Sequence, residues 1–437
     1  MWDRILKSTF SCVAWLVVAT PALAGDVSLK LDAGSGFSIQ DNTGTSEHFR
    51  VDEATGNVSR HGALFVHTTG SSGSVFMGQH AGNASTSGAS NSAFGAYALH
   101  YNTTGNANSA VGVAALYSNT TGYGNSAIGQ RALFANTTGN WNSAVGSNAL
   151  ASSTSGGSNS AFGAGALGHN TLGRYNTAAG INALSFNTIA SSNSAFGQNT
   201  LTNNYAPSAC CNSAFGSGAL QSNVSGSSNS AFGLGALGSN SSGARNVAVG
   251  QSAGANQTTG SDNLYLANSG VAAESGQIKI GTAGTHTRAF IAGIRGVTTV
   301  NANAIPVLID SAGQLGTASS SRTVKKDIRD MGDTTARLLE LRPVTFRYRE
   351  QQPTLPDGSD APPEYGLVAE EVAEVFPDLV VYDDEGKPFT VKYHELAPML
   401  LNEMKRQQRE HAQEMATLTA RLAQLEEKVA RAPEAAR

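Results

Sequence analysis

The chain has 437 residues, a formal net charge of −4, 49 glycines and only 14% charged residues, whereas an ordinary globular domain carries about 25%. This balance excludes the strongly basic surface typical of nucleic-acid binding, and the length leaves room for two or more domains. The charge is uneven, because residues 91–260 contain three arginines and no other charged residue, while the chain after residue 320 is charged at ordinary density. We therefore expect two physically different parts.

Residues 1–24 have the pattern of a secretory signal peptide. Basic residues in MWDRILK precede the apolar stretch STFSCVAWLVVAT, and PALA ends in small residues, which favours cleavage before Gly25. The apolar stretch is shorter than the roughly 20 residues of a membrane span, and no second one follows. The sequence thus predicts an exported protein, secreted or at a bacterial cell surface, with no integral membrane span after signal removal.

Residues 74–265 repeat with a period of 17, after a β segment predicted for residues 25–73. Each unit begins NSA-Φ-G, where Φ is apolar, and continues through an Ala-Leu pair to an NTTG-like loop. A fixed short period indicates stacked units, and this length suits one coil of a parallel β-solenoid or β-roll. One longer unit contains Cys210 and Cys211, which could pair with each other, pair across subunits or stay unpaired. The units start at Asn91, Asn108, Asn125, Asn142, Asn159, Asn176, Asn193, Asn212, Asn229 and Asn246.

Two apolar ladders and an asparagine ladder are expected in this solenoid. The Φ residues, such as Phe94 and Val111, would form one inward ladder, and the Ala-Leu pairs a second. Such a core buries little apolar surface per residue, whereas ordering each residue costs about 1.5 kcal/mol. This favours several chains sharing a core, with a trimer as the preferred symmetry. Triplets of the N-glycosylation pattern belong to the repeat and are given no function (Asn102, Asn119, Asn136).

In architecture these units resemble the head repeats of trimeric surface adhesins and the shafts of bacterial and phage fibre proteins. Residues 266–319 read as short strands with Gly turns, which would cap and close a fibre as a β stem. The predicted fold is therefore mainly β up to the end of this stem, and trimeric.

Beyond the stem the chain predicts a small α+β domain over residues 320–403. DIRDMGDTTARLLELRPVTFRYR reads as a strand or turn, a helix containing Leu338, Leu339 and Leu341, and a strand. GLVAEEVAEVF then reads as a short helix, and LVVYDDEGKPFTVKY as a hairpin around residues 384–386.

A long helix follows, with residues 404–431 predicted as a trimeric coiled coil. Its apolar or near-apolar positions alternate in spacing between three and four, which is typical of a coiled coil rather than of a helix packed on its own domain. Two polar positions in this seam are of the kind that sets register and oligomer number. The seam consists of Leu401, Met404, Gln408, His411, Met415, Leu418, Leu422, Leu425 and Val429.

The order SSRTVKKDI, LRPVTFRYR, YGLVAEEV, FPDLV and VKYHELAPMLLNEM, closed by a coiled coil, resembles the peptidase S74 family. This family is the C-terminal intramolecular chaperone of endosialidases and phage tail fibres, and it also occurs in myelin regulatory factors. The resemblance covers about a quarter of the chain. It implies a module that trimerises, guides folding of the β-fibre ahead of it and then cuts itself off.

The same resemblance implies a self-cleavage site in SSSRTVKKDI. In the family the cut falls just before a serine, and a lysine five positions later completes a Ser-Lys dyad. The match implies Ser320 as nucleophile, Lys325 as base and a cut between Ser319 and Ser320. The family has an acidic residue after the serine and an Arg-Leu pair before the lysine, where this chain has Ser321 and Thr323-Val324.

A Ser-Lys pair acts only in a special geometry. Serine needs a base, and lysine becomes one only when burial or a nearby cation lowers its pKa. A spacing of five separates the two side chains on a helix and on a strand, so the dyad requires a turn between its members or contact across subunits. Ser319 and Ser321 stay open as alternative nucleophiles, and Lys326 as an alternative base.

No other constellation in the sequence predicts a second chemistry. The nine histidines are scattered, without an HExxH, CxxC or glycosidase-like spacing, so no cofactor and no metal site are expected. The sequence predicts an exported homotrimeric fibre or adhesin whose chaperone cleaves itself; the alternative is a fibre trimerised by the same module without cutting. Its neutral surface could bind glycans, another surface or nothing. A virion tail fibre fits the signal peptide less well.

Overall fold

The structure is a computed structural model that describes residues 37–40, 47–52, 54–60, 63–68, 73–82, 87–301, 303–349 and 362–430. The chain forms two compact units, Met1–Phe290 and Ile291–Arg437, and each is described by itself. The predicted signal peptide lies outside the described residues.

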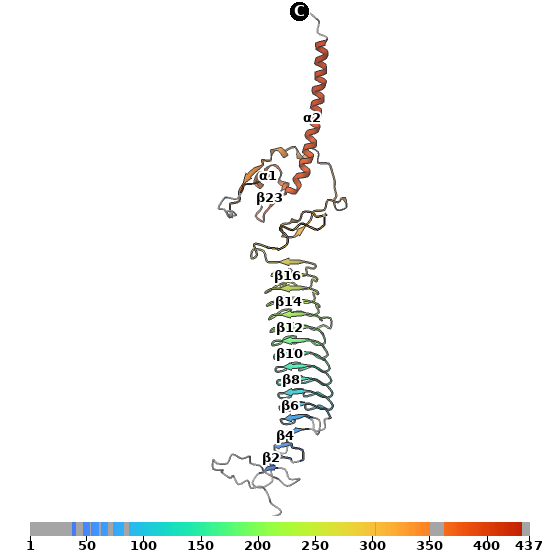
Figure 1. Ribbon diagram of the computed structural model, residues 1–437, viewed down its shortest axis with the longest axis vertical. Coiled ribbons are helices and arrows are strands. Elements are labelled where there is room, and N and C mark those ends of the chain that lie inside the picture. Colours follow the sequence, from blue (N-terminus) through green and yellow to red (C-terminus); the bar gives the residue numbers. More distant parts are fainter. Residues whose placement is uncertain are drawn as a thin grey trace, which may run out of the picture. The chain divides into compact units, whose positions relative to one another are not determined.

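The first unit begins with antiparallel strands and continues as a parallel stack (Figure 1). Strands β1 to β5 pair in chain order as antiparallel neighbours. From β5 onward each strand pairs in parallel with the next one along the chain, so that all belong to one 17-stranded sheet. The antiparallel strands are β1 (Phe37–Gln40), β2 (Glu47–Val51), β3 (Val58–Arg60), β4 (Ala63–Thr68) and β5 (Val75–Met77).

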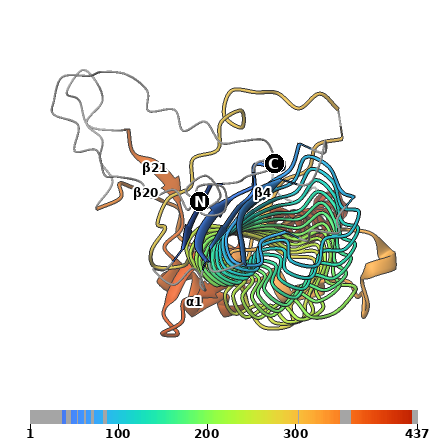
Figure 2. The same ribbon diagram turned by 90° about the horizontal axis from the view of Figure 1, so that it is seen from below.

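Each 17-residue unit forms one coil with a single three-residue strand, and turns make up the rest. The coils follow one another in register around a shared interior (Figure 2), as the repeat predicts. The strands are β6 (Ser92–Phe94), β7 (Ser109–Val111), β8 (Ser126–Ile128), β9 (Ser143–Val145), β10 (Ser160–Phe162), β11 (Thr177–Ala179), β12 (Ser194–Phe196), β13 (Ser213–Phe215), β14 (Ser230–Phe232), β15 (Val247–Val249), β16 (Leu264–Leu266) and β17 (Ile278–Ile280).

The core of the coils contains alanine and leucine, and the predicted inward Φ ladder is wrong. The Ala-Leu pairs are fully buried, as expected, but the third ladder residue is the alanine of NSA, such as Ala93. Successive strand residues point to opposite faces, so a buried Ala places Φ outside. The Φ side chains are accordingly 37–47% exposed: Met77, Phe94, Val111, Ile128, Val145, Phe162, Phe196, Phe215, Phe232, Val249 and Leu266. We call this row the Φ stripe.

The glycine after Φ is required by close approach between coils. At Gly129 the backbone has a φ of +135°, and a Cβ built there would lie 2.5 Å from the carbonyl oxygen of Gly146 in the next coil. A side chain would therefore collide with backbone, which cannot move without opening the stack. The glycine therefore permits a tight corner here.

Two ladders of buried asparagines join the coils. In the predicted ladder, Asn108 donates from its backbone N and from Nδ2 to Oδ1 of Asn91, at 3.0 and 3.2 Å. A second ladder uses the asparagines of the glycosylation-like triplets, where Asn119 Nδ2 donates to Asn102 Oδ1 at 2.8 Å. All of these side chains are fully buried. The triplets are thus structural, since a buried amide satisfies backbone groups that would otherwise lack partners.

Replacing one ladder asparagine is expected to destabilise the stack. Asn142 Oδ1 accepts from the backbone N of Asn159 at 3.1 Å, and Asn142 Nδ2 donates to the carbonyl of Gly156 at 2.9 Å. Asn142→Ala leaves both buried groups unpaired, which costs about 3 kcal/mol. Denaturant unfolding should show this loss, whereas the exposed Asn148→Gly should change the free energy of unfolding by less than about 1 kcal/mol. Equal effects would contradict the ladder's role.

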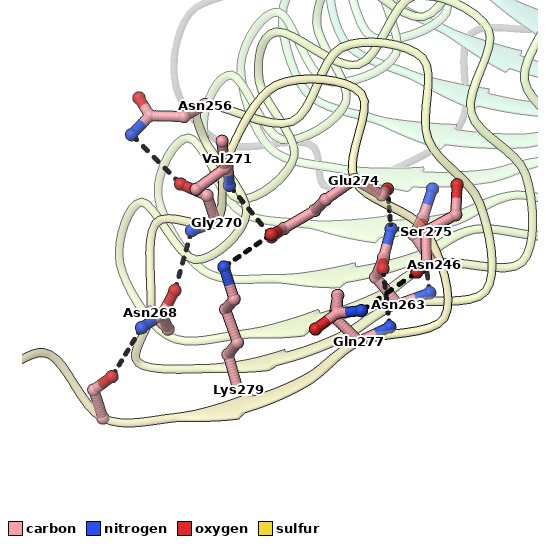
Figure 3. Close-up of polar contacts among 11 residues, drawn as sticks. Asn246, Asn256, Asn263, Asn268, Gly270, Val271, Glu274, Ser275, Gln277 and Lys279 are labelled. Carbon is pink, nitrogen blue, oxygen red and sulfur yellow. Dashed lines mark hydrogen bonds and ion pairs between the residues drawn. The ribbon is translucent and has the colours of Figure 1, made fainter. Parts of the chain in front are cut away.

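The last coil closes the stack with a polar cluster (Figure 3). Asn263 ends the first ladder: its Nδ2 donates to Asn246 Oδ1 at 3.0 Å and to the Glu274 carbonyl at 2.8 Å, and its Oδ1 accepts from Gln277 N at 2.9 Å. The Glu274 carboxylate accepts from Val271 N and pairs with the Lys279 ammonium. These contacts satisfy the groups that a further coil would have bonded.

A buried histidine makes the other end of the stack sensitive to pH. His67 in β4 is 4% exposed, stacks on Phe76 at 4.9 Å, and has no hydrogen-bond partner on either ring nitrogen. Burial lowers its pKa, so the unfolded form takes up a proton first and stability falls as the pH drops below about 6.5. We expect β4 to lose hydrogen-exchange protection between pH 7.5 and 5, after correction for intrinsic rates, and His67→Phe to remove this loss.

The second unit contains short elements and one long helix. Its elements are β18 (Leu308–Ile309), β19 (Leu315–Gly316), the 3₁₀ turns η1 (Arg322–Val324), η2 (Gly332–Thr335) and η3 (Leu338–Glu340), β20 (Val344–Phe346), β21 (Glu364–Gly366), α1 (Ala369–Val375), η4 (Pro377–Leu379), β22 (Val380–Tyr382), β23 (Pro388–Val391) and α2 (Tyr393–Ala430). The hydrophobic core consists of Val372, Leu379, Val380 and Val391, against which Leu396 and Met399 of α2 pack.

The expected short helix, hairpin and long helix are therefore present. The predicted helix around Leu338 is instead two separate 3₁₀ turns, η2 and η3. Arg337, between the two turns, has a ψ of 5° and so departs from helical backbone, and Pro343 disfavours helical backbone at Arg342. Among the described residues, no helix is both long and apolar enough to span a membrane.

Candidate functional site

The serine-rich segment contains a tight turn between the predicted nucleophile and the predicted base. Ser321 caps η1: its Oγ accepts from the backbone N of Thr323 at 3.3 Å and lies 2.8 Å from Thr323 Oγ1. Lys325 ends the turn, and its backbone N donates to the Arg322 carbonyl at 3.3 Å. Serine is a favoured cap because its hydroxyl satisfies an otherwise orphan N–H. A turn of this kind is what a Ser-Lys spacing of five requires.

The three serines differ in what their hydroxyls do. Ser321 Oγ is occupied by the cap, and Ser319 Oγ accepts from the backbone N of Ser321 at 3.3 Å. For Ser320 the structure gives no side-chain hydrogen bond to any described residue. Ser320 is therefore the one of the three serines whose hydroxyl forms no hydrogen bond within the described part of the chain.

The turn does not by itself assemble a dyad. No hydrogen bond joins Ser320 to Lys325 or Lys326 in the described residues, and the whole segment from 319 to 328 is exposed. Burial is what lowers the pKa of a lysine enough to make it a base. A single chain thus contains the serine, the lysine and the intervening turn. It does not bury the lysine, and burial is what would activate it.

Sequence reasoning missed a polar cluster that fixes α2 to the module. Glu403 is 2% exposed and pairs with Arg406 at 2.6 Å, and this guanidinium holds the pKa of the Glu403 carboxyl below its usual range. Asn402 Nδ2 donates to Thr335 Oγ1 at 2.7 Å and to the Gly332 carbonyl at 2.8 Å. The start of α2 is therefore tied to η2. The Glu-x-x-Arg spacing was the only sequence signal, and it is common on helix surfaces.

A second ion pair positions α1. Arg342 Nε donates to Glu371 Oε2 at 3.0 Å, and a further contact joins its terminal nitrogen to the other carboxylate oxygen. Arg342 belongs to the LRPVTF motif and Glu371 to YGLVAEEV, so the pair joins two motifs that are far apart in the sequence. Both side chains are exposed, which means that the pair orients the elements more than it stabilises them.

The described residues contain no group of three or more His, Cys, Asp or Glu arranged to hold a metal ion. The thiols of Cys210 and Cys211 are free, with their sulfurs 2.9 Å apart in the longer coil.

The second unit is a small α+β module that ends in a long helix. In the sequence it follows the β-solenoid. Residues 320–381 match the Peptidase S74 family, described as chaperone of endosialidase. This part of the chain is a Peptidase S74 chaperone domain. No curated protein and no solved structure matches the chain.

Proposed function

We propose that this protein is an exported homotrimeric fibre whose Peptidase S74 module directs assembly and then cleaves the chain between Ser319 and Ser320. The single observation that supports it best is the family match beginning at residue 320, directly after a segment whose apolar side chains lack partners. Three unpartnered apolar surfaces support the assembly, and the η1 segment supports the cleavage.

The Φ stripe is the first of these surfaces. It runs along the stacked coils with one exposed apolar side chain in nearly every coil, and its phenylalanines stack on each other, as Phe196 does on Phe215 at 4.7 Å. Apolar patches of such extent on soluble proteins mark interaction sites. To cover the exposed side chain of every coil, a partner must have apolar side chains at the same spacing along the stack. Another copy of this solenoid has that spacing.

The stem is the second surface. From residue 290 to residue 315 its apolar side chains are largely exposed, with Phe290 at 89% and Val300 at 100%. Only the two-residue strands β18 and β19 form within the described part of this segment. Such a segment buries too little in one chain to repay its ordering entropy, which favours folding against other copies.

The coiled-coil seam of α2 is the third surface. Its apolar members are 50–75% exposed: Leu401, Met404, Met415, Leu418, Leu422, Leu425 and Val429. Within the described residues, the hydrophobic core of the domain packs against Leu396 and Met399 of α2, which precede the seam. The heptad spacing favours burial against the same helix in two further copies.

The proposed cleavage is an intramolecular acyl transfer followed by hydrolysis. Lys325, as the free amine, takes the proton from Ser320 Oγ while Oγ attacks the carbonyl carbon of Ser319. The C–N bond breaks, the released α-amine of Ser320 receives the proton, and an ester to Oγ remains. Water then hydrolyses the ester, giving a carboxylate at Ser319 and a free N-terminus at Ser320.

Assembly would control this chemistry. In one chain Lys325 is exposed, whereas a lysine that serves as a base is covered from solvent. Packing of the stems around the turn would supply that cover. The chain would then cut only after its fibre has formed.

Sedimentation of the purified full-length chain tests the proposal together with a denaturing gel. We expect a trimer in solution and, on the gel, a large fragment and a small C-terminal one. A trimer that stays a single full-length band would favour the non-cleaving fibre. A monomer would contradict both forms of the proposal.

A further inference from the structure

One corner of the solenoid carries two highly exposed aromatic rings. Trp141 and Tyr175 are 62% and 65% exposed, more than any other large apolar side chain between residues 74 and 265. They occupy the same place in units that are two periods apart. Backbone hydrogen bonds give this alignment, since Trp141 N donates to Tyr123 O, Ser158 N to Asn140 O, and Tyr175 N to Gly157 O.

The backbone at this corner is unfavourable for large side chains. Trp141 and Tyr175 have φ values of 60° and 58°, in the left-handed region where a non-glycine residue costs about 1–2 kcal/mol. The equivalent residue one coil before Trp141 is Gly124, which avoids that cost. Leu150 has a similar φ of 51° but is fully buried, so its burial offsets the strain. The two exposed rings lack that burial, since Trp141 has only an edge-on contact with Tyr123. Other coils have a small residue with the same φ at this corner, such as Ser158 and Ser192, so the large rings set these two coils apart.

Only small residues lie at the corner between the two rings. The coil between them has Gly157 and Ser158 at the corner, so no large side chain stands between the rings. The indole of Trp141 packs back over Gly124, where a Cβ would lie 2.7 Å from its six-membered ring, and its edge-on contact with Tyr123 has ring centroids 5.4 Å apart. The backbones of the two coils are about 10 Å apart, which is enough to admit a third ring at the corner between them.

A positive charge is adjacent in sequence to the second ring. Arg174 directly precedes Tyr175 and is exposed, and residues 91–260 contain no acidic side chain that could pair with it. Further along the same corner Arg245 forms a two-bond pair with Asp262, at 2.6 and 2.7 Å. At this corner Arg245 is paired because a carboxylate lies next to it. Arg174 has no such carboxylate in the coils and can bind an external anion.

The geometry points to a carbohydrate site at this corner: we propose that a pyranose ring of an acidic saccharide inserts between Trp141 and Tyr175, with its carboxylate bound by Arg174. The apolar C–H faces of a pyranose pack on aromatic rings, and a guanidinium binds a carboxylate through two parallel hydrogen bonds. Asn140, whose Oδ1 is fixed by the backbone N of Tyr123 at 2.9 Å, presents its NH₂ group as a donor for sugar hydroxyls. This site depends neither on cleavage nor on the S74 module.

Tryptophan fluorescence tests the site directly. In the full-length chain carrying Trp2→Phe and Trp15→Phe, Trp141 is the only tryptophan. We expect hyaluronan, polygalacturonate or heparin hexasaccharide to change its emission in a saturable, salt-weakened manner, and neutral chitohexaose to bind at least tenfold more weakly. Arg174→Gln should weaken the acidic ligand at least tenfold, and Tyr175→Gly should abolish binding.

Controls separate binding from folding. Tyr175→Gly relieves a left-handed tyrosine, so its melting temperature should be unchanged or higher, while Tyr101→Ser on another corner should leave binding intact. No saturable change with any of the three acidic hexasaccharides would overturn the proposal. So would equal binding by Arg174→Gln. Shielding of Trp141 from acrylamide in the assembled protein would also overturn it, because the corner would then be a contact between copies.

Discussion

Ser320→Ala and Lys325→Ala are each expected to abolish release of the C-terminal fragment while leaving the trimer intact. Removing the hydroxyl removes the attacking atom, and removing the amine leaves the serine without a base. Because the two groups act as a unit, each single change should lower the cleavage rate by at least 1000-fold, and the double change should lower it no further. A time course on denaturing gels measures this rate.

Neighbouring residues provide the controls for the dyad. Ser319→Ala, Ser321→Ala and Lys326→Ala should still cleave, with Ser321→Ala the slowest of the three because its hydroxyl caps η1. If Ser321→Ala alone were inactive and Ser320→Ala active, the nucleophile would be displaced by one residue. If every variant cleaved as wild type does, contamination by another protease would explain the fragment.

Leu418→Asp combined with Leu422→Asp is expected to prevent both assembly and cleavage. The two leucines are 52% and 57% exposed in one chain, so the change costs a monomer little. In a trimer it would place six carboxylates in the buried seam, at several kcal/mol each. Sedimentation should give a monomer, and the gel a single full-length band.

Ala420→Asp is the matched control, since it adds a carboxylate on the face of α2 opposite the seam. It should assemble and cleave as wild type does. Cleavage by the monomeric seam variant would contradict the proposed dependence of chemistry on assembly, and a trimeric seam variant would show that α2 does not hold the copies together.

The solenoid could be predicted from the sequence because the repeat is strict. A period of 17 fixes the coil length, and Asn and Gly at constant places fix its ladders and corners. Which apolar residue points inward could not be predicted, because both Ala93 and Phe94 are apolar and the strand is only three residues long. The coil interior has room for the small alanine, so the phenylalanine is the residue left outside.

The candidate site could be predicted only in part. The spacing of Ser320 and Lys325 requires a turn, and η1 lies there. The buried Glu403 and its partners at η2 could not be anticipated, because contacts between residues about 70 positions apart leave no local pattern. The predicted strands of the stem are mostly absent from the single chain, since their apolar side chains find too few partners within it.

N-terminal sequencing of the small fragment released from the full-length protein tests the central claim most directly. We predict a sequence beginning Ser-Ser-Arg-Thr-Val-Lys-Lys, which starts at Ser320. A fragment that begins at any other residue, or a trimer from which no fragment is ever released, would contradict cleavage between Ser319 and Ser320.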